Sequence, residues 1–244
     1  MKHILTFILT ITCSTILLAQ SNEKLRITHL TDNFYIFTTW KDYKGTLFPS
    51  NGMYVVTNKG VVMIDCPWDS TQYQPLLDSI TAKHNKRVVM CMATHFHEDR
   101  TGAFDYYRQK GIKTFASKET DIMCERRKEK RAEFTFNKNS SFMVGEYKFH
   151  TGFSGEGHTP DNIVVWFPKQ KILYGGCLVK STEAADLGNL EDANVTTWKQ
   201  TMKNLKKKYK KSTFVIPGHQ AWSNGILALE HTLKLLEENK KQTP

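Results

Sequence analysis

The sequence predicts one α/β domain built as a four-layered αββα sandwich. The prediction depends on a scheme of short strand patterns followed by helical patterns, which runs through the chain twice. No segment rich in proline, serine and glycine separates the two halves, so they are expected to pack as one unit. The 244 residues, 40% hydrophobic and 11% aromatic, can fill one core, or two small ones at most, and exclude a mainly disordered chain.

The first half begins with strand patterns separated by Gly, Asn and Asp, which predicts an antiparallel meander over residues 34–37, 53–56 and 61–64. A helix is expected from Pro75, because proline is favoured in the first helical turn and Leu76, Leu77 and Ile80 follow it. The remaining elements of this half are a strand over 88–93, a helix over 104–109, a strand over 113–116 and a charged helix over 119–131.

The second half has strand patterns over residues 142–144, 147–151, 163–167, 172–174 and 214–216. The strand over 163–167 is continuously apolar, so we expect it to be buried on both faces. Apolar residues spaced by three and four predict one helix from Val195 to Tyr209 and a terminal helix from Ile226 to Leu236.

The N-terminus resembles a secretory signal peptide. Lys2 is followed by an uncharged apolar run from Ile4 to Leu18, and small residues precede a polar segment. We expect residues 1–21 to be removed, after Ala19 or Ser21, and residues 22–244 to form the domain. A transmembrane anchor is the alternative, but the run is short for a span. The protein is therefore expected to be exported, periplasmic in a host with an outer membrane, and without a membrane anchor after cleavage.

The charge balance is basic, with 34 Lys and Arg against 24 Asp and Glu and a net charge of +10. Such a charge attracts nucleic acid, anionic lipid or acidic ligands, and export disfavours nucleic acid as a partner. Lysines from Lys199 to Lys211 lie on the polar side of the predicted helix. We interpret them as a solvated face, with binding of a polyanion or membrane surface as the alternative. A monomer with a small-molecule partner is expected.

Several residues with metal-binding side chains stand where a predicted strand meets a loop. His95, His97 and Asp99 follow one strand, His158 lies in a glycine-rich turn, and Cys177 and His219 each follow a glycine after a strand. Singly, Cys177 and His219 would more often be core residues. Together, imidazole, carboxylate and thiolate groups at strand ends predict a zinc site.

These motifs resemble those of the metallo-β-lactamases, and specifically of their subclass B1. The shared motifs are H-x-H-x-D at residues 95–99, G-H-T-P-D-N around His158, G-G-C-L-V-K around Cys177 and L-G-N ending at Asn189. The similarity spans roughly residues 25–240. Relatives that cleave thioesters or process tRNA usually carry a further histidine after the aspartate and an aspartate that bridges the metals. Here Arg100 and Cys177 stand at those positions, which favours a lactamase.

The resemblance implies two zinc ions, one held by His95, His97 and His158 and the other by Asp99, Cys177 and His219. It implies a metal-bound hydroxide, oriented by Asp99, that attacks the β-lactam carbonyl. Asn189 would donate to the developing oxyanion, and Lys180 would pair with the substrate carboxylate. The structural alternatives are a surface lysine at Lys180 and a turn former at Asn189.

The resemblance also implies walls for the cleft. Residues 42–51 fall where the subclass has a hairpin flap over bound antibiotic, with Leu47 or Phe48 as the contact. Trp68 resembles the aromatic residue of the opposite wall, with an ordinary core tryptophan as the alternative. Asp65 and Arg100 are expected to fix the metal loop through hydrogen bonds.

The implied activity is a zinc-dependent β-lactamase, including carbapenemase activity, that confers resistance to penicillins, cephalosporins and carbapenems. One alternative is another hydrolase of the same fold, acting on thioesters, phosphoesters or lactones. A second is a non-catalytic protein that binds zinc or a polyanion.

Overall fold

The computed structural model describes residues 24–223 and 225–242. The predicted signal peptide over residues 1–21 and its cleavage site lie outside the described residues. Within the described part of the chain, no helix has the length and apolar character needed to cross a membrane.

The first sheet has seven strands in sequence order. The first four pair antiparallel, as the predicted meander requires, and the last four pair in parallel. The strands are β1 (Leu25–Thr31), β2 (Phe34–Tyr43), β3 (Thr46–Thr57), β4 (Gly60–Ile64), β5 (Val88–Met92), β6 (Lys113–Ser117) and β7 (Phe134–Phe136).

The second sheet has five strands in the order β12-β11-β10-β9-β8, and only β11 and β12 are parallel. They are β8 (Ser141–Val144), β9 (Tyr147–Gly152), β10 (Val164–Phe167), β11 (Ile172–Gly176) and β12 (Phe214–Pro217). The helices are η1 (Ser70–Gln72), α1 (Tyr73–His84), α2 (Glu98–Thr101), α3 (Phe104–Gln109), α4 (Lys118–Arg127), α5 (Val195–Lys208) and α6 (Leu227–Gln242).

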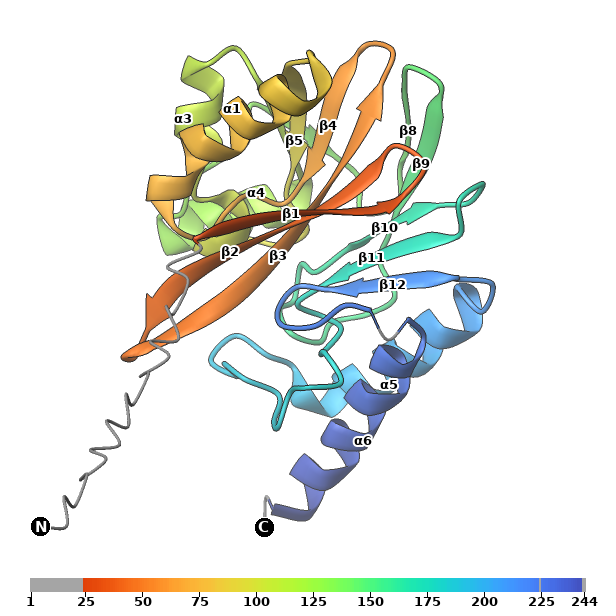
Figure 1. The fold of residues 1–244 in the computed structure, drawn as a ribbon. Helices are drawn as coiled ribbons and strands as arrows, with labels where there is room; N and C mark the ends of the chain where they lie inside the picture. The colour runs from red at the N-terminus through yellow and green to blue at the C-terminus, as the bar shows by residue number, and fades with distance from the viewer. Residues whose placement is uncertain (1–23, 224, 243–244) are drawn as a thin grey trace, which may run out of the picture.

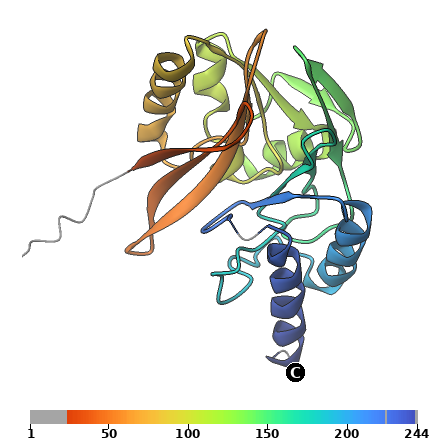
Figure 2. The same ribbon diagram turned by 45° about the vertical axis from the view of Figure 1, so that its right-hand side comes forward.

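Three apolar cores separate four layers, which confirms the predicted αββα sandwich. One core packs α1 and α3 on the outer face of the first sheet, with Leu76 and Phe104 among its residues. A second fills the space between the two sheets. The third packs α5 and α6 on the outer face of the second sheet around Trp198. Figures 1 and 2 show the two helical layers on opposite sides of the paired sheets.

Strand β10 shows how the sequence produces this layering. Val164 faces the core beneath α5 and α6, and Val165 faces the core between the sheets. Successive side chains of a strand point to opposite faces, so a strand between two cores must be apolar on both. The prediction that this strand is buried on both faces is confirmed, although Trp166 is only half-buried.

Two features differ from the sequence-based expectation. The helix expected over 119–131 is α4, which ends at Arg127 because Lys128 adopts a left-handed conformation and its N–H bonds back to Glu125. Strands β1 and β7 were not predicted, since β1 lies at an edge and is mostly half-buried, and β7 has only three residues. Pairing with neighbouring strands, more than their own sequences, makes them strands.

Strand ends from both sheets converge at one edge of the sandwich. Asn51 of β3 donates from its backbone N–H to Gly218 O at 2.8 Å, and Ser50 and His219 form an isolated bridge between the two halves. Thus the end of β12 lies against the first sheet, and the loops after β5, β11 and β12 open at the same place.

Candidate metal centre

The loop after β5 carries the first group of candidate ligands. His97 caps α2, and its carbonyl accepts from the N–H groups of Arg100 at 2.9 Å and Thr101 at 3.1 Å. The Thr101 hydroxyl donates to Phe96 O at 3.1 Å. These bonds hold His95 and His97 before the short helix and place Asp99 within its first turn.

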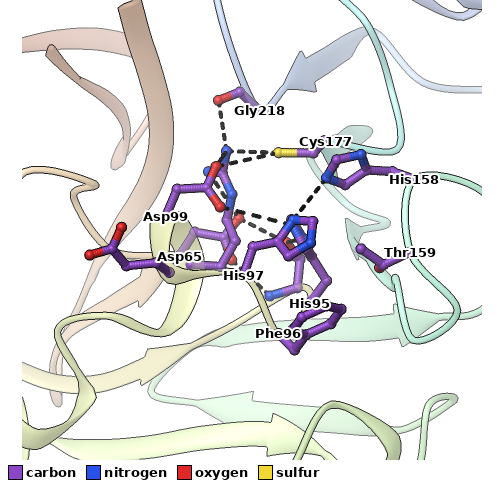
Figure 3. A network of polar contacts seen from close by, with 12 residues as sticks. Asp65, His95, Phe96, His97, Asp99, His158, Thr159, Cys177 and Gly218 are labelled. Carbon is purple, nitrogen blue, oxygen red and sulfur yellow. Dashed lines mark hydrogen bonds and ion pairs between the residues drawn. The ribbon is translucent and has the colours of Figure 1, made fainter. Parts of the chain in front are cut away.

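Three imidazole rings turn their nitrogens toward one another (Figure 3). Nδ1 of His97 lies 3.2 Å from Nε2 of His95 and 3.2 Å from Nε2 of His158. The rings stand nearly perpendicular, with interplanar angles of 79° to 89°. The three predicted histidines, from two different loops, therefore meet at one point.

Asp99, Cys177 and His219 form a second group beside the first. Asp99 Oδ2 lies 3.1 Å from His219 Nε2 and 3.7 Å from Cys177 Sγ. Gly176, the last residue of β11, has a φ of +55°. This left-handed conformation, which glycine adopts readily, turns the chain so that the thiol of Cys177 lies near Asp99. Asp99 also faces the histidines, since its Oδ1 lies 3.9 Å from His95 Nε2.

The spacing within both groups suits tetrahedral zinc. Nitrogens bound to zinc at about 2.0–2.1 Å lie about 3.3 Å apart, close to the separation of the imidazole nitrogens. Ligand atoms lie within 4.8 Å of one another in three overlapping sets of these residues, which are His95, His97 and Asp99, then His95, His158 and Cys177, and finally Asp99, Cys177 and His219. The donor set of imidazoles, carboxylate and thiol is the one that zinc prefers.

Arg100 lies behind the second group and is completely buried. Its Nη2 donates to Asp99 Oδ2 at 2.8 Å, to Cys177 Sγ at 2.9 Å and to Gly218 O at 3.0 Å. A Cβ atom on Gly218 would stand 2.7 Å from Cys177 Sγ, so only glycine leaves room for this contact.

Asp65 forms hydrogen bonds that fix the loop carrying His95, as predicted. Its carboxylate accepts from Thr94 N at 2.7 Å, Thr94 Oγ1 at 2.9 Å and the Tyr174 hydroxyl at 2.9 Å, and it lies 3.4 Å from Arg100 Nη1. Thr94 directly precedes His95. Asp65 and Arg100 thus join the metal loop to the core by bonds to fixed neighbours.

Burial controls the protonation of these groups. It lowers the pKa of His95 and His158 well below the usual value, and it lowers that of His97 and His219. Burial also raises the pKa of the Cys177 thiol to about 12. Burial would raise the pKa of Asp99 too, but the guanidinium of Arg100 holds it well below the usual range. Neutral imidazoles and an ionised carboxylate are the forms that bind a cation.

Two outer contacts set the direction in which the imidazoles point. His97 Nε2 lies 3.1 Å from Asp192 Oδ2, and Arg127 pairs with the other oxygen of the same carboxylate. His219 Nδ1 donates to Pro49 O at 2.9 Å. Asp192 was not predicted from the sequence, because it lies in a polar loop before α5, three residues after the L-G-N motif, and no metal-binding residue type stands at a strand end there.

A cavity of about 760 Å³ opens beside the candidate ligands. It is lined by His97, Asp99, His158, Cys177 and His219 and by residues of both halves, including Lys180, Asn189, Trp68, Phe48, Tyr43 and Lys44. Such a volume suits a small molecule.

Lys180 and Asn189 both line this cavity, as expected from the resemblance. The Lys180 ammonium lies 5.3 Å from the centre of the Trp198 ring, and burial lowers its pKa. Asn189 Oδ1 accepts from Glu191 N at 3.1 Å, the bond of a turn former. That bond uses the side-chain oxygen and leaves the amide nitrogen available as a donor.

The hairpin of β2 and β3 forms one wall. Its two-residue turn at Lys44 and Gly45 joins Tyr43 to Thr46. Phe48 lines the cavity 5.4 Å from the His219 ring, whereas Leu47 is 56% exposed and is not among the described residues that line it. Tyr43 is the aromatic residue near the tip, which the sequence analysis missed.

Trp68 is half-buried and lines the same cavity, so it is not an ordinary core tryptophan. Its ring centre lies 5.4 Å from that of Tyr43, and its Nε1 donates to Glu98 Oε2 at 3.2 Å. The same carboxylate oxygen accepts from Lys41 Nζ at 2.8 Å. Glu98, which follows the metal-binding histidines, therefore joins the hairpin to Trp68 through one carboxylate oxygen.

Comparison with known proteins gives consistent matches over most of the chain. Residues 45–219 match the family model of the metallo-beta-lactamase superfamily. The chain is 41% identical over 223 residues to metallo-beta-lactamase type 2 of Elizabethkingia meningoseptica, covering 91% of this chain and 89% of that relative. It is 42% identical over 240 residues to metallo-beta-lactamase IND-1 of Chryseobacterium indologenes, covering 98% and 99%. The solved structure of metallo-beta-lactamase IND-7 matches with a TM-score of 0.85 at 42% identity, covering 88% of this chain and 99% of that one.

Proposed function

The chain belongs to the metallo-β-lactamase superfamily and is a hydrolase of β-lactams, and from this premise we propose that it uses two zinc ions to open penicillins, cephalosporins and carbapenems. The observation that carries the proposal is that adjacent metal-binding groups line one cavity. The biological role would be resistance to these antibiotics.

We assign one zinc to His95, His97 and His158 and the other to Asp99, Cys177 and His219. The separations within each group, such as 3.2 Å between His97 and His158 nitrogens, support the assignment. Bound zinc would supply Lewis acidity and lower the pKa of water toward neutrality. The chain itself supplies Asp99, whose carboxylate faces both groups and would orient the attacking water by accepting its hydrogen bond.

Residues on the far wall would place the substrate. Lys180, which has no carboxylate partner among the described residues, would pair with the carboxylate that β-lactams carry on the ring nucleus. Asn189 would donate from its amide nitrogen to the carbonyl oxygen as negative charge develops there. Trp68 and Phe48 would cover the apolar parts of the antibiotic.

We further propose that the protein is exported to the periplasm after removal of residues 1–21 and acts as a monomer. The charged and apolar sequence of the N-terminus supports export. The mass of the exported protein tests cleavage, and sedimentation tests the oligomeric state.

The deciding experiment is hydrolysis of a chromogenic cephalosporin and a carbapenem by the exported protein, with and without a zinc chelator, alongside measured zinc content. Turnover of both that stops on chelation and returns with zinc is the expected result. A thioesterase or lactonase of the same fold would instead bind zinc, leave both lactams intact and cleave a lactoyl thioester or a lactone.

A further inference from the structure

The turn at the tip of the β2–β3 hairpin carries a lysine at an unfavourable position. Lys44 has a φ of +54° and Gly45 a φ of +80°, as in the two-residue turn that favours Asn or Gly at its first central position. A long side chain in the left-handed region costs on the order of 1 kcal/mol. The turn's side-chain hydrogen bond comes from Asp42, whose Oδ1 accepts from Gly45 N at 3.0 Å. Among the described residues, the Lys44 side chain forms no hydrogen bond within the turn.

Side chains at the hairpin tip contact one another along the cavity wall. The Lys44 ammonium lies 5.2 Å from the centre of the Tyr43 ring, and that ring lies 5.4 Å from Trp68. Tyr43, Lys44 and Trp68 all line the cavity. The ammonium is thus presented at the edge of the space where substrate would bind.

Lys44 lacks the ion pair that the neighbouring Lys41 forms. Lys41 is neutralised by Glu98 at 2.8 Å, whereas no carboxylate of the described residues forms an ion pair with Lys44. The other acidic groups on the cavity wall are engaged elsewhere. Asp99 pairs with Arg100, and Asp186 Oδ1 accepts from Gly188 N at 2.7 Å. Lys44 is therefore a cation on the cavity wall that can form an ion pair with a bound anion.

The two lysines of the cavity come from different halves of the fold. Lys180 follows β11 and lies near Trp198 of α5, whereas Lys44 lies on the hairpin of the first sheet. The candidate ligands of both halves also line the same space. In penicillins and cephalosporins, the ring carboxylate and the acylamino side chain leave opposite ends of the bicyclic nucleus. With the ring carboxylate at Lys180, an acyl side chain that spans the cavity would reach toward Lys44 on the other half.

We propose that Lys44 is a second anion-binding point, which makes the enzyme favour β-lactams that carry a second carboxylate on the acyl side chain. The inference rests on the proposed β-lactamase function and names a substrate class within it. Because the ion pair would be exposed, its effect on binding should be modest and sensitive to salt.

Benzylpenicillin and carbenicillin test this proposal, because they differ in an α-carboxylate on the acyl side chain. The measured quantity is the ratio of kcat/KM for carbenicillin to that for benzylpenicillin. Lys44→Gln should lower this ratio by about two- to five-fold, through KM, and Lys44→Arg should retain it. In the unmodified enzyme the ratio should also fall between about 0.1 M and about 1 M NaCl, as the Debye length shortens from about 10 Å to about 3 Å.

Lys59→Gln is the matched control. Lys59 is an exposed lysine in the turn at the other end of β3 and is not among the described residues that line the cavity. Its replacement by glutamine removes the same charge as Lys44→Gln. An unchanged ratio in Lys44→Gln, or an equal change in Lys59→Gln, would overturn the role of Lys44 while leaving the β-lactamase function intact. Absence of turnover of both penicillins would instead overturn the proposed function, and the inference with it.

Discussion

The imidazole of His97 is held from both sides, because its Nε2 lies 3.1 Å from Asp192 Oδ2 while its Nδ1 faces the other two histidines. A neutral imidazole carries one proton, so donation from Nε2 to the carboxylate leaves the lone pair of Nδ1 directed at the metal position. Asp192 is in turn paired with Arg127 of α4. The ring orientation of one ligand therefore depends on two residues outside the ligand set.

Replacing Asp192 should weaken zinc binding. Asp192→Ala removes the acceptor for His97 Nε2 and is expected to lower zinc affinity by about 10- to 100-fold, measured by competition with a chromophoric chelator. Asp192→Asn keeps an acceptor oxygen and should recover part of the affinity. Glu191→Ala is the control, because this exposed carboxylate also lies near Arg127, at 3.7 Å, and contacts no candidate ligand in the described structure. Equal zinc affinity in Asp192→Ala and the unmodified protein would contradict the prediction.

Replacing Cys177 should remove one metal. We expect Cys177→Ser to bind one zinc where the unmodified protein binds two, because a hydroxyl is a much poorer zinc ligand than a thiolate. Metal content by mass spectrometry measures this. Cys124→Ser is the control, since Cys124 is also a buried free thiol but lies outside the candidate ligand groups of the described residues. Two zinc ions in Cys177→Ser, or one in Cys124→Ser, would show that the assignment is wrong.

The ion pair between Lys41 and Glu98 should connect the hairpin to the metal loop. A double-mutant cycle with Lys41→Gln and Glu98→Gln is expected to give a coupling free energy of about 0.2–1 kcal/mol in urea unfolding, because the pair is partly exposed. Amide exchange in residues 41–48 should become faster in each single variant. Unchanged exchange in both variants would contradict a role of the ion pair in holding the hairpin and favour the tilted ring contact of Tyr43 with Trp68.

His84 should make the stability of the metal-free protein depend on pH. Burial lowers the pKa of His84, which bonds to the Tyr54 hydroxyl at 3.0 Å. His84 then binds a proton less readily in the folded state than in the unfolded chain. Its contribution to the free energy of unfolding is therefore fully present above about pH 6.5, and it is lost as the pH falls below that value. His84→Gln should reduce this loss in urea unfolding at pH 7.5 and pH 5.5, measured with a chelator present. His29→Gln, at an exposed histidine of β1, serves as the control; a loss as large in His84→Gln as in the unmodified protein would refute the assignment.

Zinc should stabilise the fold by an amount that grows with the logarithm of its free concentration. Both donor groups join loops of the two halves, so they exist only in the folded chain and binding adds to the free energy of unfolding. At a thousand times the dissociation constant the gain is about 4.1 kcal/mol for one site. Thermal unfolding across a zinc buffer series measures it. A midpoint independent of zinc concentration would contradict a site assembled by folding.

The layered fold and the convergence of strand-end residues were predictable because both depend on local patterns. Strand β10 carries the continuous apolar run that a strand between two cores requires, and the histidines, Asp99 and Cys177 each lie in a segment that follows a strand. Edge strand β1 and the short β7 were not predictable, because pairing with neighbours decides their conformation.

The kinds of ligand and their placement at strand ends follow from the amino-acid sequence, since side-chain chemistry and hydrophobic periodicity are properties of short segments. The groups that bond to the ligands and those that line the cavity depend on the folded arrangement. Asp192 reaches His97 from 95 positions along the chain, and Glu98 bonds to Lys41 from 57 positions away. Such contacts depend on how sheets and loops pack, because a polar side chain in a loop pairs with whatever group the folded chain brings within hydrogen-bond distance.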